Sequence, residues 1–257
     1  MKRSFLIARK DVLTFFLNPG AGIVIAGFFL LATYFFLNYL GNFNIAVSRS
    51  GSNYLGIEKI NLNQWVVENY FLTLIVINII LVPIVISRAI VEEKRQRTWA
   101  LLLTYPISNI QIVVGKYLGV LFPILLLQGL AGLLPFGLSF IGNPEIALIF
   151  SGYLALLLNT LTLIAIALAV SFYCNTTVSA SFVSFFVLAL LFSLQMIAGT
   201  ISPSLATVVD YLSPLSQAKV LISGKLSLAA LCYHIFIVFF ALFILRESLS
   251  QTRYGQK

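Results

Sequence analysis

The sequence predicts an all-α polytopic membrane protein with six transmembrane helices. Of its 257 residues, 60% are hydrophobic and only 9% are charged, and the mean hydropathy is +1.01. A soluble domain needs more polar surface than that. The few charges also leave long charge-free intervals, and a helix of roughly 20 apolar residues crosses about 30 Å of hydrocarbon. Residues 1–257 therefore predict a single transmembrane domain.

Residues 3–17, before the first charge-free interval, predict a helix that lies in the membrane interface. Apolar and polar side chains separate to opposite sides of the helical wheel, which is typical of such helices. The apolar side holds Phe5, Ala8, Val12, Phe15 and Phe16, and the polar side holds Arg3, Lys10, Asp11 and Thr14. Asn18-Pro19-Gly20 then predicts a turn into the membrane. The alternative is a frayed terminus whose charges only set topology.

The spans follow from the charge-free intervals. The longest interval, Ile146 to Val209, has 64 residues. As one helix it would be about 96 Å long, so it must hold two spans, which the polar run 174–177 divides. The expected spans are 20–40, 70–87, 117–141, 146–172, 178–200 and 226–245. The connections 41–68 and 201–225 are expected to be short loops.

The basic residues support this count, because Lys and Arg accumulate in short cytoplasmic connections. With the N-terminus in the cytoplasm, the cytoplasmic segments hold twelve of the 16 basic residues: Lys2, Arg3, Arg9, Lys10, Arg88, Lys94, Arg95, Arg97, Lys116, Arg246, Arg253 and Lys257. The other side holds Arg49, Lys59, Lys219 and Lys225. We therefore expect both termini in the cytoplasm. The net charge of +8 is explained as a topology signal that flanks apolar runs, so no nucleic acid is expected as a partner.

The connection 88–109, between the second and third spans, is more ordered than a topology signal requires. Glu93 and Arg97 are spaced i, i+4 with the acid first, the favourable direction for a helical pair. Leucines at 101–103 follow Trp99, and Pro106 ends the helix. This pattern predicts a short helix along the membrane surface, with charges toward water and Trp and Leu toward lipid. The alternative is a solvated charge run that only fixes topology.

The run EEKRQRTWALLLTYPISNIQIVVGKYLG, residues 92–119, resembles the signature of ABC-2 type transporter permeases. In that signature a charged stretch leads to Thr, a Leu-Leu pair, Pro, a small hydroxyl residue and Gly-Lys before the next span. The matching positions are Glu92, Glu93, Thr98, Leu102, Leu103, Pro106, Ser108, Gly115 and Lys116. Arg97 departs from the pattern, because the family usually has Gly there. The tail, residues 210–249, resembles the gliding-motility and nitrous-oxide-accessory type members.

The resemblance implies the permease subunit of an ATP-driven ABC-2 exporter with a type V exporter-like fold, in a prokaryotic cytoplasmic membrane. In this family the connection between the second and third spans is a coupling helix that docks on a cytoplasmic ATPase. The ATPase-coupling residues would then be Glu92, Glu93, Arg97, Thr98, Leu102, Leu103 and Pro106. The implied partners are this ATPase subunit, which binds ATP and Mg²⁺, the lipid bilayer, and a second permease chain, identical or paralogous. Substrate would pass between the two permease chains, and a lipid, a glycan-linked lipid or another amphipathic molecule suits so apolar a protein.

The chain itself is expected to hold no cofactor. A Walker A loop needs GxxxxGK followed by Ser or Thr, because the hydroxyl holds magnesium. Tyr117 follows Gly115-Lys116, and Leu226 follows Gly224-Lys225. The two cysteines, Cys174 and Cys232, show no CxxC spacing and indicate neither a disulfide framework nor a metal cluster.

The alternative class is an intramembrane enzyme, or a scaffold subunit that uses the same fold without transport. His234 is the only histidine, and no acid or cysteine stands three or four residues away from it. We therefore favour a structural, hydrogen-bonded histidine over a catalytic one. The polar residues in the spans are expected to bond across helices, and the small ones to allow close packing. These residues are Asn78, Gln128, Asn159 and Gln195, and the pair Gly115 and Gly119.

Overall fold

A computed structural model describes residues 2–50, 61–96, 99, 107–140, 144–200 and 202–254. Within these residues the chain is helical, and six helices are long and apolar enough to cross a membrane. The predicted all-α class and its six spans are therefore confirmed. The expected surface helix between the second and third spans falls mostly outside the described residues.

The N-terminal helix and the first span meet at a sharp corner. Helix α1 (Lys2–Leu17) ends one residue before α2 (Pro19–Ser50) begins. At the corner Asn18 Oδ1 accepts a hydrogen bond from the Gly20 backbone N–H at 2.9 Å. Pro19 suits the first helical position, because it has no N–H that would remain unpaired there. The turn predicted at residues 18–20 is thus present, while α2 runs past the expected end at residue 40.

The other helices alternate between long spans and short connecting pieces. They are the π-helix η2 (Asn63–Glu68), α3 (Asn69–Arg95), α5 (Asn109–Gly132), α6 (Leu134–Gly137), the 3₁₀ helix η3 (Leu138–Phe140), α7 (Ile146–Ser171), α8 (Thr177–Ala198), α9 (Pro203–Leu212), α10 (Pro214–Ile222) and α11 (Leu228–Tyr254). Capping boxes open two of the spans. Ser108 exchanges hydrogen bonds with Gln111 at the start of α5, and Thr176 does so with Ser179 at the start of α8.

Helices α3 and α5 extend toward each other beyond the expected spans. Helix α3 continues past Ser87 to Arg95, and α5 begins at Asn109 instead of residue 117. The first residues of the expected surface helix are therefore the last two turns of the second span. Charged side chains mark where lipid contact ends, but the backbone hydrogen bonds of a helix continue into water unchanged. Hydropathy therefore predicts where the lipid-facing part of a span ends, but it does not predict where the helix itself ends.

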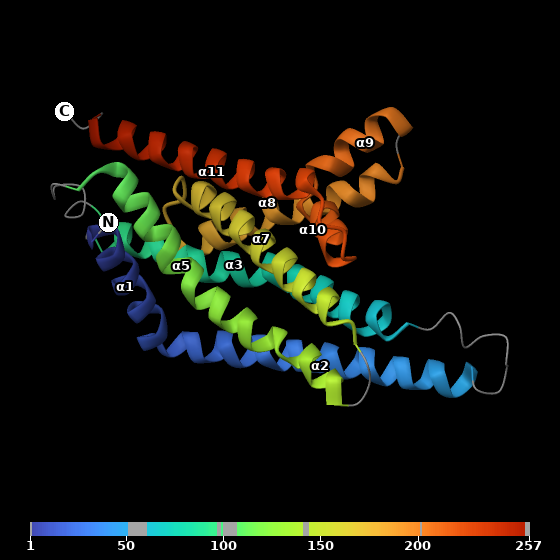
Figure 1. Cartoon of the computed structure of the whole chain (residues 1–257). Helices are drawn as coiled ribbons and strands as arrows, with labels where there is room; N and C mark the ends of the chain where they lie inside the picture. The colour runs from blue at the N-terminus through green and yellow to red at the C-terminus, as the bar shows by residue number, and fades with distance from the viewer. Residues whose placement is uncertain are drawn as a thin grey trace.

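Two short helices occupy part of the connection 201–225, which was expected to be a loop. Helices α9 and α10 lie at the end of the molecule opposite the termini (Figure 1). Each begins with a proline at the first helical position, preceded by Ser202 or Ser213. Asn159 of α7 donates a hydrogen bond to the Pro214 carbonyl at 3.3 Å, which attaches the start of α10 to the bundle. These Ser-Pro pairs were a start signal in the sequence that the loop assignment missed.

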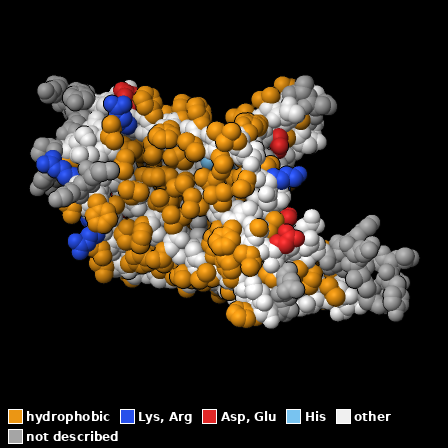
Figure 2. Space-filling view, in the orientation of Figure 1, with side chains coloured by type: hydrophobic (Ala, Val, Ile, Leu, Met, Phe, Trp, Pro, Cys, Tyr) orange, Lys and Arg blue, Asp and Glu red, His pale blue; other side chains and the backbone are white. Residues whose placement is uncertain are grey.

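Three spans form the centre of the bundle and three surround it. In the most apolar stretch of α3, α5 and α7, 61% of residues are buried, against 22% in α2, α8 and α11. Side chains of the outer spans face outward, and apolar side chains cover the middle of the face shown in Figure 2. Such a surface suits lipid contact along the whole bundle.

Both termini lie at one end of the bundle, together with α1, the C-terminal end of α3 and the N-terminal end of α5 (Figure 1). We call this the charged end, defined by α1, the end of α3 with its C-cap (residues 88–96) and residues 109–119 of α5. An even number of spans requires that both termini share one side. The expected coupling segment 88–109 thus begins and finishes at the charged end.

Candidate functional site

The candidate site is the charged end, where residues of the expected coupling segment meet α1 and the end of α7. Of the seven expected coupling residues, Glu92 and Glu93 lie in α3. The other five, Arg97, Thr98, Leu102, Leu103 and Pro106, lie outside the described residues. The geometry below therefore concerns the base of the segment.

Glu92 lies on the outer side of the last turn of α3. Its Oε1 accepts hydrogen bonds from Arg95 at 2.7 Å and from Gln96 at 2.9 Å. The Arg95 side chain is 70% exposed and that of Glu92 is 29% exposed. Both charges are therefore available to a partner that approaches the charged end from water.

Glu93, the next residue, points the other way, into the protein. Its side chain is only 13% exposed, and its carboxylate lies 2.5 Å from Lys10 Nζ and 2.7 Å from Lys116 Nζ. Lys10 belongs to α1 and Lys116 to α5. Glu93 thus joins the base of the coupling segment to two other helices, and little of its carboxylate faces water.

Lys116 is the centre of this cluster. The residue is 1% exposed, and its Nζ lies 3.1 and 3.0 Å from the two carboxylate oxygens of Asp11. The ammonium also donates to the Ala89 carbonyl of α3 at 2.8 Å. One side chain therefore connects α1, α3 and α5. Three of its four polar contacts are to carboxylate oxygens, which take the place of water around the buried ammonium.

Asp11 corrects the prediction that it lies on the water-facing side of α1. Its side chain is 9% exposed and faces α5. Burial raises the pKa of Asp11, and the nearby Lys116 ammonium opposes that shift. The helical wheel was drawn for a helix that meets only lipid and water. Helix α1 also packs on α5, so its third environment is protein.

The close approach of α1 to α5 depends on the two glycines of the GxxxG pair. A Cβ at Gly115 would lie 2.9 Å from the Ile7 Cβ and 2.9 Å from the Ser4 carbonyl oxygen, both in α1. A Cβ at Gly119 would lie 2.7 Å from the Asp11 Cβ. The close-packing role predicted for this pair is confirmed. It also explains why Asp11 can reach Lys116, which stands between the two glycines.

The other side of the segment's base is attached to the end of α7. Lys94 Nζ donates to the Phe172 carbonyl and lies 4.4 Å from the centre of the Phe172 ring. The Trp99 ring meets the same ring edge-on, with centroids 6.1 Å apart. Trp99 is 8% exposed, so the prediction that it faces lipid was wrong. Packing on Phe172 buries the indole more fully than an interfacial position would.

The polar side chains within the spans bond across helices, as predicted. Gln128 Nε2 donates to Asn78 Oδ1 at 2.7 Å, Asn78 Nδ2 donates to Thr160 Oγ1 at 3.2 Å, and Thr160 Oγ1 donates to Gln128 Oε1 at 2.8 Å. This closed triangle joins α3, α5 and α7, the central helices. Among the described residues Gln195 makes no such bond. It lies partly buried near the end of α8.

His234 behaves as a hydrogen-bonded structural residue. Its Nδ1 lies 2.8 Å from Thr162 Oγ1, and the ring is 1% exposed. Within the described parts of the chain, no three His, Cys, Asp or Glu side chains come close enough together to hold a metal ion. The site's chemistry, where the structure describes it, is ion pairing, hydrogen bonding and packing.

Sequence reasoning missed the cluster of Lys10, Asp11, Glu93 and Lys116. It treated three of them as topology or surface charges, and the fourth, Glu93, as the partner of Arg97. One signal was available: Lys116 stands between two glycines at the start of an apolar run, where a buried charge needs an acid within reach. The acid's identity was not readable, because Asp11 is 105 residues away in sequence.

The comparisons with known proteins agree with this architecture. A comparison with curated proteins finds no match. The family model described as "ABC-2 family transporter protein" matches residues 58–245, which is most of the chain and includes the coupling segment and the last five spans. The resemblance to gliding-motility and nitrous-oxide-accessory type members stays a prediction. Six spans, the 92–119 signature and this match together show that the chain belongs to the family of ABC-2 transporter membrane proteins.

Proposed function

We propose that this chain is the permease subunit of an ATP-driven ABC-2 exporter and that segment 88–109 couples it to a separate ATPase. The observation that supports the proposal is the attachment of the segment's base. Glu93 holds it to α1 and α5, while Lys94 and Trp99 hold it to the end of α7. A displacement of the segment by a docked protein therefore reaches all three central helices.

Rigid attachment matters because coupling has to carry energy. Moving a permease from 1:99 to 99:1 between two conformations takes about 5.5 kcal/mol of differential binding. A loosely attached loop would change its own conformation instead of moving the helices behind it. The buried ion pairs and the packed indole make the base of this segment part of the bundle.

The geometry divides the roles of the two adjacent acids. Glu92 and Arg95 carry charges exposed at the charged end, so we assign them to contact with the ATPase. Glu93 points inward and acts as a positioning residue that fixes the segment. ATP and Mg²⁺ would be bound by the partner ATPase, as expected for a family whose membrane chain and ATPase are separate subunits.

The proposal includes a second permease chain, which forms the pathway with the first. Helix α3 is central, yet a row at i, i+4 spacing on it is exposed: Val76, Ile80 and Ile84. Helices α2 and α8 both pack on α3 and have mostly exposed surfaces themselves. We place the second chain against this row, so that the substrate passes between the two chains.

The charge bias supports an orientation with the charged end in the prokaryotic cytoplasm. Single cysteines introduced at Lys219, beyond the far end of the bundle, should react with an impermeant maleimide added outside intact cells. A cysteine at Gln96 should react only after the membrane is made permeable. Labelling of Gln96→Cys in intact cells would reverse this orientation.

Charge reversal tests the coupling proposal. Glu92→Lys and Arg95→Glu are two separate variants. Each should lower co-purification of the ATPase, because both charges face the proposed partner. Membrane levels and melting temperature should stay unchanged, since neither side chain is part of the buried cluster. Lys219→Glu, at the opposite end, is the matched control. Wild-type ATPase association and ATPase activity in both charged-end variants would contradict the assignment, and so would equal loss in the control.

A further inference from the structure

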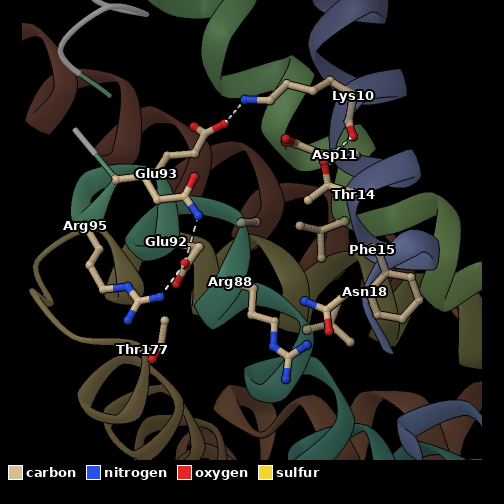
Figure 3. A pocket seen from close by; sticks show the side chains of 15 residues that line it. Lys10, Asp11, Thr14, Phe15, Asn18, Arg88, Glu92, Glu93, Arg95 and Thr177 are labelled. Carbon is tan, nitrogen blue, oxygen red and sulfur yellow. Dashed lines mark hydrogen bonds and ion pairs between the residues drawn. The ribbon is translucent and has the colours of Figure 1, made fainter. Parts of the chain in front are cut away.

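A cavity of about 550 Å³ opens at the charged end beside α1, α3 and the start of α8 (Figure 3). Its walls are amphipathic. Phe15, Val85 and Val120 give an apolar part, while polar and charged side chains line the rest. The volume falls within the range of about 300–1,000 Å³ that small-molecule sites occupy. The coupling proposal assigns roles to Glu92, Glu93 and Arg95 in the wall of this cavity, but it gives no role to the space itself.

One of the cations that line the cavity forms no direct ion pair with the residues that the structure describes. Each lining acid lies within 3.0 Å of its own cation. The pairs are Asp11 with Lys116, Glu93 with Lys10, and Glu92 with Arg95. Arg88 also lines the cavity, is exposed, and makes no ion pair or hydrogen bond with the residues that the structure describes. The pKa of Glu92 is lowered mainly by its hydrogen bond from Arg95 and also by the Arg88 charge, so Glu92 offsets part of that charge at a distance. No described acid pairs directly with the Arg88 guanidinium, whose N–H groups are left for another partner.

Arg88 lies against the corner between α1 and α2. A Cβ built at Gly20 would lie 3.0 Å from Arg88 Nη2 and 3.1 Å from Asn18 Oδ1. Because Asn18 Oδ1 already accepts from the Gly20 N–H, the amide Nδ2 is the group left to donate. Figure 3 shows Arg88 and Asn18 together at one end of the cavity, away from the Lys10–Glu93 pair. Two side chains thus offer N–H donors at one place.

The corner also sets the depth of these donors in the membrane. Leu17 and Ile23 flank it and are 80% and 78% exposed, as expected of side chains in lipid. Helix α1 is predicted to lie along the membrane surface, and α2 is long and apolar enough to cross the membrane. With α1 in its predicted interfacial position and α2 as a span, Arg88 would lie at the level of the lipid phosphate groups, with acyl chains beside it. A guanidinium pairs with phosphate oxygens through two parallel N–H bonds, which suits it to this position.

We propose that this cavity binds the headgroup of an anionic phospholipid from the leaflet at the charged end. The phosphate accepts hydrogen bonds from the Arg88 guanidinium and from Asn18 Nδ2, and the first part of an acyl chain contacts Phe15. The bound lipid would hold the corner between α1 and α2 against α3. This proposal does not depend on transport or on an ATPase.

The test is a lipid titration of the purified full chain in detergent, with bound lipid counted by native mass spectrometry. Phosphatidylglycerol should bind at least tenfold more tightly than zwitterionic phosphatidylcholine. Arg88→Gln should weaken phosphatidylglycerol binding about tenfold, which corresponds to about 1.4 kcal/mol. Arg88→Lys should fall between, because it keeps the charge but loses the two-bond geometry. The control is Arg95→Gln, an arginine on the same cavity that already has a partner and should change binding by less than twofold.

Three results would overturn the proposal. Unchanged phosphatidylglycerol binding in Arg88→Gln would remove Arg88 from the site. An equal loss in Arg95→Gln would show general surface attraction instead of a site. Binding of millimolar inorganic phosphate that is lost in Arg88→Gln, with phosphatidylglycerol bound no more tightly than phosphatidylcholine, would show that the cavity takes free phosphate and not a lipid. Because Arg88 is exposed, Arg88→Gln should melt at the wild-type temperature in lipid-free detergent, and Arg88→Lys provides the comparison if it does not.

Discussion

Replacement of Lys116 by methionine tests whether the buried cluster fixes the charged end. Methionine keeps an unbranched apolar stem in the same space but removes the ammonium. The carboxylates of Asp11 and Glu93, which are 9% and 13% exposed, then lose the cation that lies 3.0 and 2.7 Å from them. The Ala89 carbonyl also loses its 2.8 Å donor. Two nearby buried acids remain. Among the described residues, Glu93 keeps a direct ion pair with Lys10, while Asp11 keeps only the weaker, more distant attraction of the Lys10 charge.

Removing one partner of a buried ion pair costs about 3–5 kcal/mol, because the other charge remains buried without compensation. We expect Lys116→Met to lose about that much stability. Asp11→Asn should cost less, about 1.5–3 kcal/mol, since Lys116 keeps Glu93. The double variant Asp11→Asn/Lys116→Met should recover part of the loss, because its remaining acid still has Lys10. A coupling energy of at least about 1 kcal/mol between the two substitutions is expected.

The pH dependence gives an independent check. The pKa of Asp11 is raised in the folded protein, so the folded state binds a proton at a pH where the unfolded chain does not. For such an acid, the stabilising contribution is fully present below the unfolded pKa and is lost as the pH rises through the folded pKa. Without the Lys116 ammonium, which opposes this shift, the effect should be larger. The penalty of Lys116→Met should therefore be smaller at pH 5 than at pH 8.

Thermal unfolding in detergent, followed by tryptophan fluorescence, measures these effects. A loss of 3–5 kcal/mol lowers the melting temperature of a chain this long by roughly 6–20 °C. Trypsin cleavage after Arg3, Arg9 or Lys10, all within α1, should become faster in Lys116→Met at the same time. A wild-type melting temperature for Lys116→Met would refute the argument. So would a double variant whose loss equals the sum of the two single losses, because the two residues would then be independent.

Three further substitutions test other contacts. Gly119→Leu should lower the free energy of unfolding by about 1–3 kcal/mol, because the leucine side chain would push α1 away from α5. Gly129→Leu is the control and should cost little, because the space around Gly129 is open. Equal effects of the two substitutions would contradict the role of the close approach. Trp99→Ala should speed trypsin cleavage of the coupling segment several-fold, because the indole holds the segment against Phe172. Trp65→Ala, at a tryptophan that is 41% exposed, is the control and should leave this cleavage unchanged. Unchanged cleavage in Trp99→Ala would show that the indole does not hold the segment. Gln128→Leu should cost about 1 kcal/mol in unfolding by opening the triangle with two other helices, and a neutral result would show that the triangle adds no stability.

Several features could be predicted from the sequence because they depend on short stretches. Span number depends on length and hydropathy, and the break at residues 174–177 carries its own capping residues. The 92–119 signature indicated the family that the comparison shows. The GxxxG pair indicated a close contact, although not which helix makes it.

The tertiary structure alone decided which apolar and charged groups are inside. Lipid tails and protein interiors are equally apolar, so hydropathy does not distinguish a central helix such as α3 from an outer one such as α11. For the same reason Trp99 was placed in lipid when it packs on Phe172. The pairing of Asp11 with Lys116 needs α1 folded back onto α5, a contact between segments about 100 residues apart that no local pattern encodes. The local sequence determines which side chains each helix carries. The packing of the helices on one another determines which of those side chains contact water, lipid or protein.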